Sequence, residues 1–383
     1  MDRNVHVLSI TGFLIDLVSS SWYMVLPLYL EELGASTIAI GASYAFISIG
    51  WYTLQFPGGL FGDKIGRKTL ILFCTFIFIP CYVLLSIAQV WWMATLAIVV
   101  YWASNGLEYP SFNSMIAESV SMKEWEMAFA TYVFFINLSW AIGPLIGAFI
   151  IPLFGFQLIF YIGIIISGFC TIIQCFFLRE TLHKTSKDKR KISLRMSKNL
   201  MYFLASCSIF GLAYGLVSPL IALYANKILE LSFFEIELMF SIAQFATCFI
   251  TPPCGLIIKK IGSKHGLAVG IFGSCLSITI WVFSRSLWTA IILISLFSIF
   301  LFSLRDTAYG SLVSNITVPQ TRATVFGIAA ITIGISTAIG STVGSYIWEF
   351  YNPILPFILC GILSFPSVLL LLKVKILSEK TSD

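Results

Sequence analysis

Four ionisable residues lie inside long apolar segments of this sequence, where an unpaired charge is costly. They are Asp16, Glu108, Arg305 and Asp306. A lone charge at the centre of a membrane helix costs at least ~2.5–3.5 kcal/mol, so such residues usually pair with one another or serve an ion or proton pathway. We therefore expect these four side chains to line a cavity for a substrate or for protons.

The pairing of these four groups allows more than one arrangement. In our leading hypothesis Arg305 bridges to Glu108, with Asp16 as the alternative partner. Arg305 and Asp306 are adjacent and point about 100° apart on a helix, so they need not pair with each other. With three acids and one base, at least one carboxyl lacks a partner, and burial would favour its protonated form and make it a proton carrier. Asp16 is the best single candidate, and the alternative for the group is an ion pair that only holds two segments in register.

The segments that must position these residues are apolar and about twenty residues long. Of the 383 residues, 58% are hydrophobic and 11% are charged, whereas a soluble domain is roughly half apolar and about a quarter charged. Each run can cross ~30 Å of hydrocarbon as a helix. Twelve such spans are expected, at 7–30, 36–60, 69–88, 91–117, 127–151, 157–178, 200–225, 233–258, 266–284, 287–314, 324–350 and 354–372. The sequence therefore predicts an all-α integral membrane protein with twelve transmembrane helices.

The basic residues predict the orientation and the domain boundaries. If both termini are cytoplasmic, 20 of the 23 Lys and Arg residues lie on the inner side, as the positive-inside rule requires. We expect a multi-pass protein of the plasma membrane. Its parts are an N-terminal six-helix bundle (1–180), a basic cytoplasmic linker (181–199), a C-terminal six-helix bundle (200–376) and a short cytoplasmic tail (377–383).

The two bundles repeat each other at an offset of 196–197 residues. "GLFGDKIGRK" at 59–68 matches "GLIIKKIGSK" at 255–264, and "AIGPLIGAFI" in the fifth span matches "AIGSTVGSYI" in the eleventh. Parallel repeats of this kind, joined by a loop, are typical of carriers whose halves rock about a central site and open it to one side at a time.

The first of these phrases resembles the signature of the major facilitator superfamily, G-x-x-x-D-(R/K)-x-G-R-(K/R). Its positions are occupied by Gly59, Asp63, Lys64, Gly66, Arg67 and Lys68. The resemblance covers the whole chain and implies the two-bundle fold of that family. It also implies a conformational latch of the outward-facing state, in which Asp63 faces the start of span 11 near Thr324 and Arg67 pairs with Glu118. A helix N-terminus favours a carboxylate. The alternative is that these charges only anchor the loop and set the topology.

The second copy of the phrase lacks the charged members of this latch. Asp63 is replaced by Lys259, Arg67 by Ser263 and Glu118 by Asn315. Because the three are lost together, the latch is expected on one side only.

The fifth span carries a further resemblance. Gly143, Pro144 and Gly147 in "GPLIGA" resemble the G-P-x-x-G-G element of drug:proton antiporters, where small residues permit close helix packing. Those antiporters usually carry an arginine in span 4 at the position held here by Trp102, so the antiport residues differ from the family pattern.

These observations predict a secondary active transporter that exports a small organic solute, amphiphilic or cationic, in exchange for protons. The alternatives are proton-coupled uptake of a polar metabolite such as a sugar or organic acid, and a sensor or scaffold that does not transport. No enzyme, metal or cofactor motif and no nucleic-acid partner is expected; the partners are the solute, protons and the bilayer, and the chain is expected to act as a monomer. Aromatic candidates for the cavity wall are Trp22, Tyr23, Trp102, Tyr109, Tyr214 and Tyr309.

Overall fold

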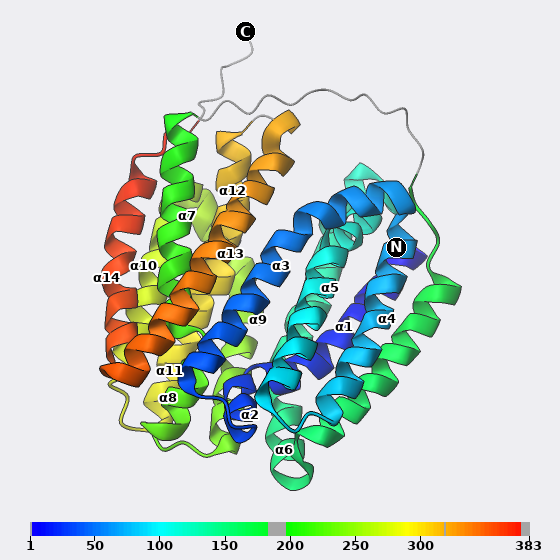
Figure 1. The fold of residues 1–383 in the computed structure, drawn as a ribbon. Coiled ribbons are helices and arrows are strands. Elements are labelled where there is room, and N and C mark those ends of the chain that lie inside the picture. The colour runs from blue at the N-terminus through cyan, green and yellow to red at the C-terminus, as the bar shows by residue number, and fades with distance from the viewer. Residues whose placement is uncertain (1, 183–196, 318, 377–383) are drawn as a thin grey trace.

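The computed structural model describes residues 2–182, 197–317 and 319–376, and all regular elements in these ranges are helices (Figure 1). Most of the predicted linker (181–199) and the predicted tail (377–383) lie outside the described residues.

The first half of the chain forms the elements α1 (Arg3–Tyr23), α2 (Leu26–Glu32), α3 (Thr37–Ile65), α4 (Arg67–Ser86), α5 (Trp91–Glu118), η1 (Met122–Glu124) and α6 (Trp125–Phe177). The second half forms α7 (Lys198–Val217), α8 (Ile221–Lys227), α9 (Phe233–Ile261), α10 (Ser263–Trp281), α11 (Leu287–Ser298), η2 (Ile299–Arg305, a π-helix), α12 (Asp306–Ile316), α13 (Pro319–Phe350) and α14 (Leu355–Leu372). We call these two sets the N-terminal and C-terminal halves.

The two halves are built by the same local rules, as α3 and α9 show. Each of these helices has 29 residues. Each begins at a serine, Ser36 or Ser232, whose hydroxyl accepts a hydrogen bond from a backbone N–H of the first turn and so caps the helix. Each ends at a glycine with positive φ, 106° at Gly66 and 83° at Gly262, a conformation that other residues seldom adopt. The helix boundaries therefore repeat at the offset of 196 residues.

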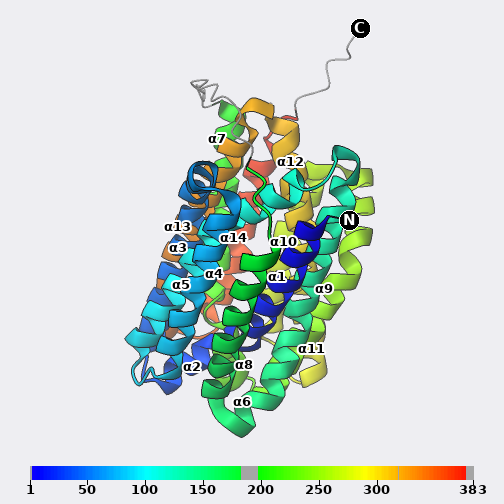
Figure 2. The same ribbon diagram turned by 90° about the vertical axis from the view of Figure 1, so that its right-hand side faces the viewer.

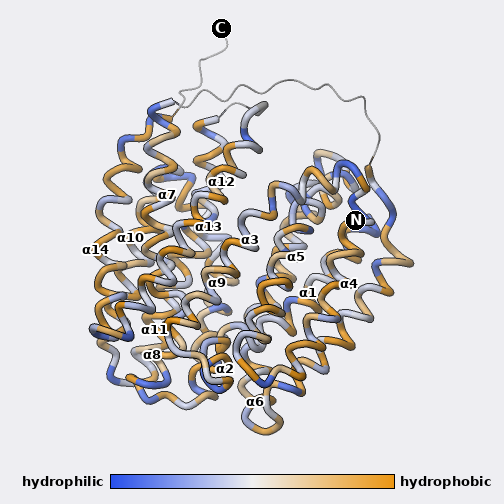
Figure 3. The backbone as a smooth tube through the Cα atoms, viewed as in Figure 1, coloured by the Kyte–Doolittle hydropathy of each residue, from blue (hydrophilic) through white to orange (hydrophobic). Residues whose placement is uncertain are grey.

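The helices are consistent with the twelve expected crossings. By length and hydropathy, nine candidate spans are present in the described ranges, and one of them, Met122–Phe177, contains the reversal at Gly155 (φ 75°), which makes α6 two crossings. The helices α5 and α10 are not among these nine candidates, because they contain more polar residues, but both are long enough to span the membrane. Hydrophobic residues dominate the helices and hydrophilic ones gather at the two ends (Figure 3).

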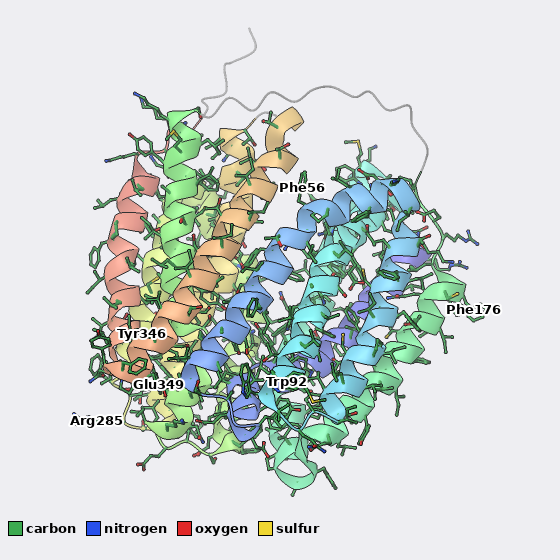
Figure 4. The ribbon with its side chains drawn as sticks, viewed as in Figure 1. Phe56, Trp92, Phe176, Arg285, Tyr346 and Glu349 are labelled. Atoms are coloured by element: carbon green, nitrogen blue, oxygen red, sulfur yellow. The ribbon has the colours of Figure 1, made fainter. Side chains whose placement is uncertain are left out.

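The surface between these two ends is apolar. Large aromatic side chains point outward from several helices, and Figure 4 labels Trp92, Phe176 and Tyr346, whose exposed fractions are 58%, 75% and 48%. A soluble protein seldom exposes so much apolar surface. These side chains face lipid in a membrane protein.

The two halves meet at one end of the molecule and separate toward the other (Figures 1 and 2). We call the end where α6 stops and α7 starts the linker end. At the opposite end Glu31 of α2 pairs with Lys227 of α8. Nearby, α3 packs against α13 and α6 against α9, with Gly41 close to Ser345 and Phe149 in ring contact with Phe234. The halves are therefore closed against each other at the opposite end.

Candidate functional site

A cavity of about 480 Å³ lies between the two halves, a size suited to a small organic ligand. The N-terminal half contributes residues from α1, α3 and α6, and the C-terminal half contributes residues from α7, α8, α9, α11, η2 and α12. Most of the wall is apolar or aromatic, with Asn137, Gln244, Thr247 and Asp306 among the few polar groups. The cavity thus depends on both halves and changes shape when they move.

A second, acidic pocket of about 270 Å³ adjoins this cavity inside the N-terminal half. It contains both Asp16 and Glu108. The two spaces share Trp51, Ile136 and Trp140 in their walls. The indole N–H of Trp140 donates a hydrogen bond to Oδ2 of Asp16 at 3.2 Å. Trp140 therefore connects the wall of the central cavity to the acidic group behind it.

Glu108 is the more buried of the two acids. Its exposed fraction is 4%, and its Oε2 atom has no hydrogen-bond partner in the described part of the chain. An ionised carboxylate in this position would lack compensation, so the pocket favours a proton or a cation beside it. Asp16 and Glu108 share one pocket, whereas the sequence placed them only in the same general cavity.

An aromatic group surrounds the boundary between the two spaces. Tyr23 lies 4.8 Å from Trp102 and 5.9 Å from Trp140, measured between ring centroids. Trp51 lies 5.7 Å from Trp102, and Tyr44 lies 6.2 Å from Tyr23. We call Tyr23, Tyr44, Trp51, Trp102 and Trp140 the aromatic group. Its π-faces are suited to stack on a flat ligand or to attract a cation.

Arg305 does not form the bridge to Glu108 that our leading hypothesis expected. Its Nη1 atom lies 2.5 Å from Oδ1 of Asp306, and its guanidinium carbon lies 4.4 Å above the ring of Phe210. Arg305 is the last residue of a π-helix, whose hydrogen bonds run from i to i+5, and its side chain contacts the first residue of the following α-helix. Arg305 therefore pairs with Asp306 and not with Glu108, which corrects the leading hypothesis.

The structure separates the aromatic candidates named from the sequence. Tyr23 and Tyr214 line the central cavity, and Trp102 and Tyr109 line the acidic pocket. Tyr309 lies beside Arg305, with 5.5 Å from the guanidinium carbon to the ring centroid. Trp22 is 1% exposed and belongs to the core. Three members of the aromatic group, Tyr44, Trp51 and Trp140, were missed because hydropathy does not reveal which side of a span faces the cavity.

The charged residues of the motif lie at the junction of α3 and α4, where they form a cluster at the linker end. Arg67 is 8% exposed and contacts Asp63 at 2.5 Å and Glu118 at 3.4 Å. The side chain of Asp63 is 61% exposed and so is not packed at the start of α13. In this conformation the ends of α3 and α13 are apart (Figure 1), so the two contacts proposed for the latch are not made together.

A further acid, Glu180, also belongs to this cluster and was not expected. Its carboxylate accepts hydrogen bonds from the backbone N–H groups of Arg67 at 3.0 Å and Lys68 at 3.1 Å. It therefore caps the N-terminus of α4, where free N–H groups favour an anion. The Lys68 ammonium donates to the carbonyl of Cys175 at 2.7 Å. The loop is thus tied to the end of α6, just before the linker.

The remaining residues of the motif have simpler positions. Lys64 is exposed, and Gly66 provides the turn with positive φ between α3 and α4. Gly59 leaves room for a side chain, whereas a Cβ at Gly62 would lie 2.3 Å from Oγ of Ser111. Gly62, in the last turn of α3, therefore permits the close approach of α5.

The C-terminal half has a neutral counterpart of the Arg67–Glu118 pair. Nδ2 of Asn315 donates to Oγ of Ser263 at 3.1 Å. These are the positions that match Glu118 and Arg67 in the repeat. A hydrogen bond thus holds α12 to α10 where an ion pair holds α5 to α4.

The small residues of the fifth span pack against α1. A Cβ at Gly143 would lie 1.9 Å from Oγ of Ser20, and one at Gly147 would lie 2.2 Å from the carbonyl oxygen of Ser21. The hydroxyl of Ser20 donates to the carbonyl of Ser139 at 3.0 Å. Pro144 lies between them inside α6 without ending the helix. The motif therefore fixes α1, and with it Asp16, against α6.

The Arg67 contacts lead to a testable expectation. We expect Arg67→Ala to slow transport about tenfold, because removing one partner of such a pair costs ~1–3 kcal/mol and a barrier change of ~1.4 kcal/mol corresponds to a tenfold change in rate. The exposed neighbour Lys64→Ala is the matched control and should transport at the wild-type rate. Initial rates in proteoliposomes test both, and an unchanged rate for Arg67→Ala would show that the charges only shape the loop.

Two repeated helical halves with a cavity between them are typical of membrane carriers that work by alternating access. Comparison with known proteins supports this: the sequence model of the Major Facilitator Superfamily matches residues 8–234 and 201–382. The chain belongs to this superfamily, is a multi-pass membrane transporter and is not an enzyme.

Its relatives are distant. It is 25% identical to an uncharacterised MFS-type transporter of Methanocaldococcus jannaschii, over 97% of this chain and 95% of that protein. It is 26% identical to the multidrug resistance protein MdtG of Proteus mirabilis, over 68% of each chain. The fold is that of the nucleoside transporter NupG, with a TM-score of 0.80 at 15% identity, covering 97% of this chain and 99% of that one.

Proposed function

We propose that this transporter exports small organic cations in exchange for protons. The proposal depends on one observation: the aromatic group lies beside the pocket that contains the two acids, Asp16 and Glu108. Cations bind aromatic faces, and the attraction grows when water is excluded. The partial similarity to MdtG, whose name is that of a multidrug resistance protein, supports export.

Competition for Asp16 and Glu108 supplies the exchange. Together the two carboxylates can balance two positive charges, so a cation bound after both have been protonated would be an uncompensated positive charge in a buried pocket. Protonation of both carboxyls therefore displaces the cation, and binding of the cation displaces a proton. No further energy source is required, because the transmembrane proton gradient drives the cycle.

We propose the following orientation and setting. Both termini face the cytoplasm, since the linker end carries most of the basic residues, and the protein lies in the plasma membrane. The central cavity is made from the two halves of one chain, which supports action as a monomer.

Transport in proteoliposomes with an imposed pH gradient tests this proposal. N-methyl-4-phenylpyridinium is a suitable probe, with the anion 4-phenylbenzoate and a neutral sugar as comparison solutes. We expect the cation to accumulate on the acidic side and the comparison solutes to show no accumulation beyond that in protein-free liposomes. Protein-dependent accumulation of the anion or the sugar on the alkaline side would instead support proton-coupled uptake. Absence of counterflow with every solute would contradict transport of these classes and favour a sensor or scaffold.

A further inference from the structure

Glu237, in the second turn of α9, is buried without a partner. Its exposed fraction is 0%, and neither carboxylate oxygen has a hydrogen-bond partner in the described part of the chain. An ionised carboxylate in such a place costs several kcal/mol if nothing compensates it. The residue is absent from both the central cavity and the acidic pocket, so the proposed exchange does not use it.

The carboxyl group lies in the contact between the two halves at the opposite end. A Cβ at Gly147 of α6 would lie 2.9 Å from its Oε1 atom. On the cavity side of this point Ser241 Oγ donates to the carbonyl of Ala141 at 2.7 Å. On the other side the rings of Phe149 and Phe234 meet at 5.3 Å. We call these contacts the α6–α9 interface, and Glu237 lies in its middle.

The hydroxyl groups around Glu237 are already committed as donors. Ser21 Oγ donates to the carbonyl of Val18 at 2.7 Å, and Ser241 Oγ to that of Ala141. The main-chain carbonyl of Ser21 lies against the same glycine as the Glu237 carboxyl. A carbonyl can accept from a protonated carboxyl but repels a carboxylate. The closed interface therefore suits the neutral acid.

No counter-ion among the residues that the structure describes offers an alternative explanation. Neither α11 nor the segment of α6 between Tyr132 and Tyr161 has an ionisable side chain. On α8, Tyr224 donates to the carbonyl of Val282, and Lys227 is paired with Glu31.

Within the described ranges, the other elements next to α9 also provide no counter-ion for Glu237. Their ionisable groups either have other partners or lie far from Glu237 along the element. On η2 and α12, Arg305 and Asp306 pair with each other. On α1, Asp16 accepts from Trp140. On α10, Cys275 is buried, while Lys264 and His265 lie in its first turn, at the linker end.

The repeat shows that a carboxylate is not needed to build this contact. At the offset of 196 residues Glu237 corresponds to Gly41 of α3. In the α3–α13 contact Gly41 approaches Ser345 and the carbonyl of Ser341, and a Cβ added to Gly41 would lie 2.6 Å from that carbonyl oxygen. The same place is thus filled by no side chain in one interface and by an acid in the other.

We propose that Glu237 is a proton-binding site that controls closure of the α6–α9 interface. When the halves separate at the opposite end, water reaches the carboxyl and it ionises. Closure then requires that a proton be taken up from that side. The inference goes beyond the proposed function, because it concerns the conformational equilibrium and holds for any solute.

Distance measurements on the full chain in nanodiscs test this assignment. Spin labels at Leu153 and Arg285, both exposed and on different halves at the opposite end, report its opening (Figure 4 labels Arg285). The labels are placed in a Cys175→Ser background, since the other eight cysteines are buried or partly buried. We expect the ratio of closed to open molecules to fall as the pH rises, by up to about tenfold per pH unit for a single linked proton.

Glu237→Gln should remove this dependence and keep the short distance at every pH, because the amide is a permanent neutral substitute for the acid. Glu237→Leu should do the same and serves if the amide variant fails to fold. The matched control is Glu235→Gln, two residues away, whose carboxylate only accepts from Ser232 at the start of α9; it should behave as wild type. A wild-type pH response in both Glu237 variants, or no response in the unmodified chain, would overturn the proposal.

Discussion

Asp16→Asn is expected to abolish proton-driven transport while leaving the protein folded. The carboxylate is the acceptor for the Trp140 indole at 3.2 Å and shares its pocket with Glu108. Asparagine can keep the hydrogen bond to Trp140 through its carbonyl but can neither bind a proton nor balance a cation. Hydrogen bonds and contacts to charged groups contribute ~1.5–3 kcal/mol, so binding of an organic cation should weaken about tenfold to a hundredfold. Uptake into acid-loaded proteoliposomes and equilibrium binding at two pH values measure the two effects.

The same experiment tests the second acid of the pocket, Glu108. Glu108→Gln should also weaken cation binding, and if both acids exchange protons for the cation, either variant should flatten the pH dependence of binding. Glu126→Gln, on the exposed first turn of α6, is the control for loss of one negative charge and should leave transport unchanged. Full proton-driven transport by Asp16→Asn would show that this carboxyl is not a coupling group.

Much of the fold could be predicted from the sequence because the bilayer leaves few alternatives. A span must satisfy its own backbone hydrogen bonds, so apolar runs of about twenty residues become helices. The repeated phrase at 59–68 and 255–264 aligned the halves, and the observed helix bounds of α3 and α9 follow that alignment. The reversal within α6 at Gly155 also separates the fifth and sixth expected spans.

Side-chain pairing could be predicted less well, because it depends on local helix geometry and on how the halves dock. The π-helix at Ile299–Arg305, next to the Arg305–Asp306 pair, was not predicted from the sequence. Glu237 lies only four residues into its helix and beside Glu235, so it resembles an interfacial charge in the sequence. The contrast with Gly41 at the matching position was the available signal that it lies in a close contact between helices.

The second large effect is expected from Gly41→Ala, in the contact between α3 and α13. An added Cβ would lie 2.2 Å from Oγ of Ser345 and 2.6 Å from the carbonyl oxygen of Ser341. The serine side chain can rotate, but the main-chain carbonyl of α13 can move only if the helices part. Overpacking of this kind costs ~1–3 kcal/mol, which corresponds to a shift of about 5- to 150-fold between two states.

This cost falls on one conformation and not on folding, since α3 and α13 belong to different halves. We therefore expect Gly41→Ala to keep the thermal stability of the detergent-solubilised protein, to open the opposite end and to slow transport. The spin-label pair at Leu153 and Arg285 reports the opening. Gly168→Ala is the matched control, because no atom lies within 4 Å of a Cβ at that position. A closed opposite end in Gly41→Ala would mean that α13 yields locally, and that this contact does not determine which side of the cavity is open.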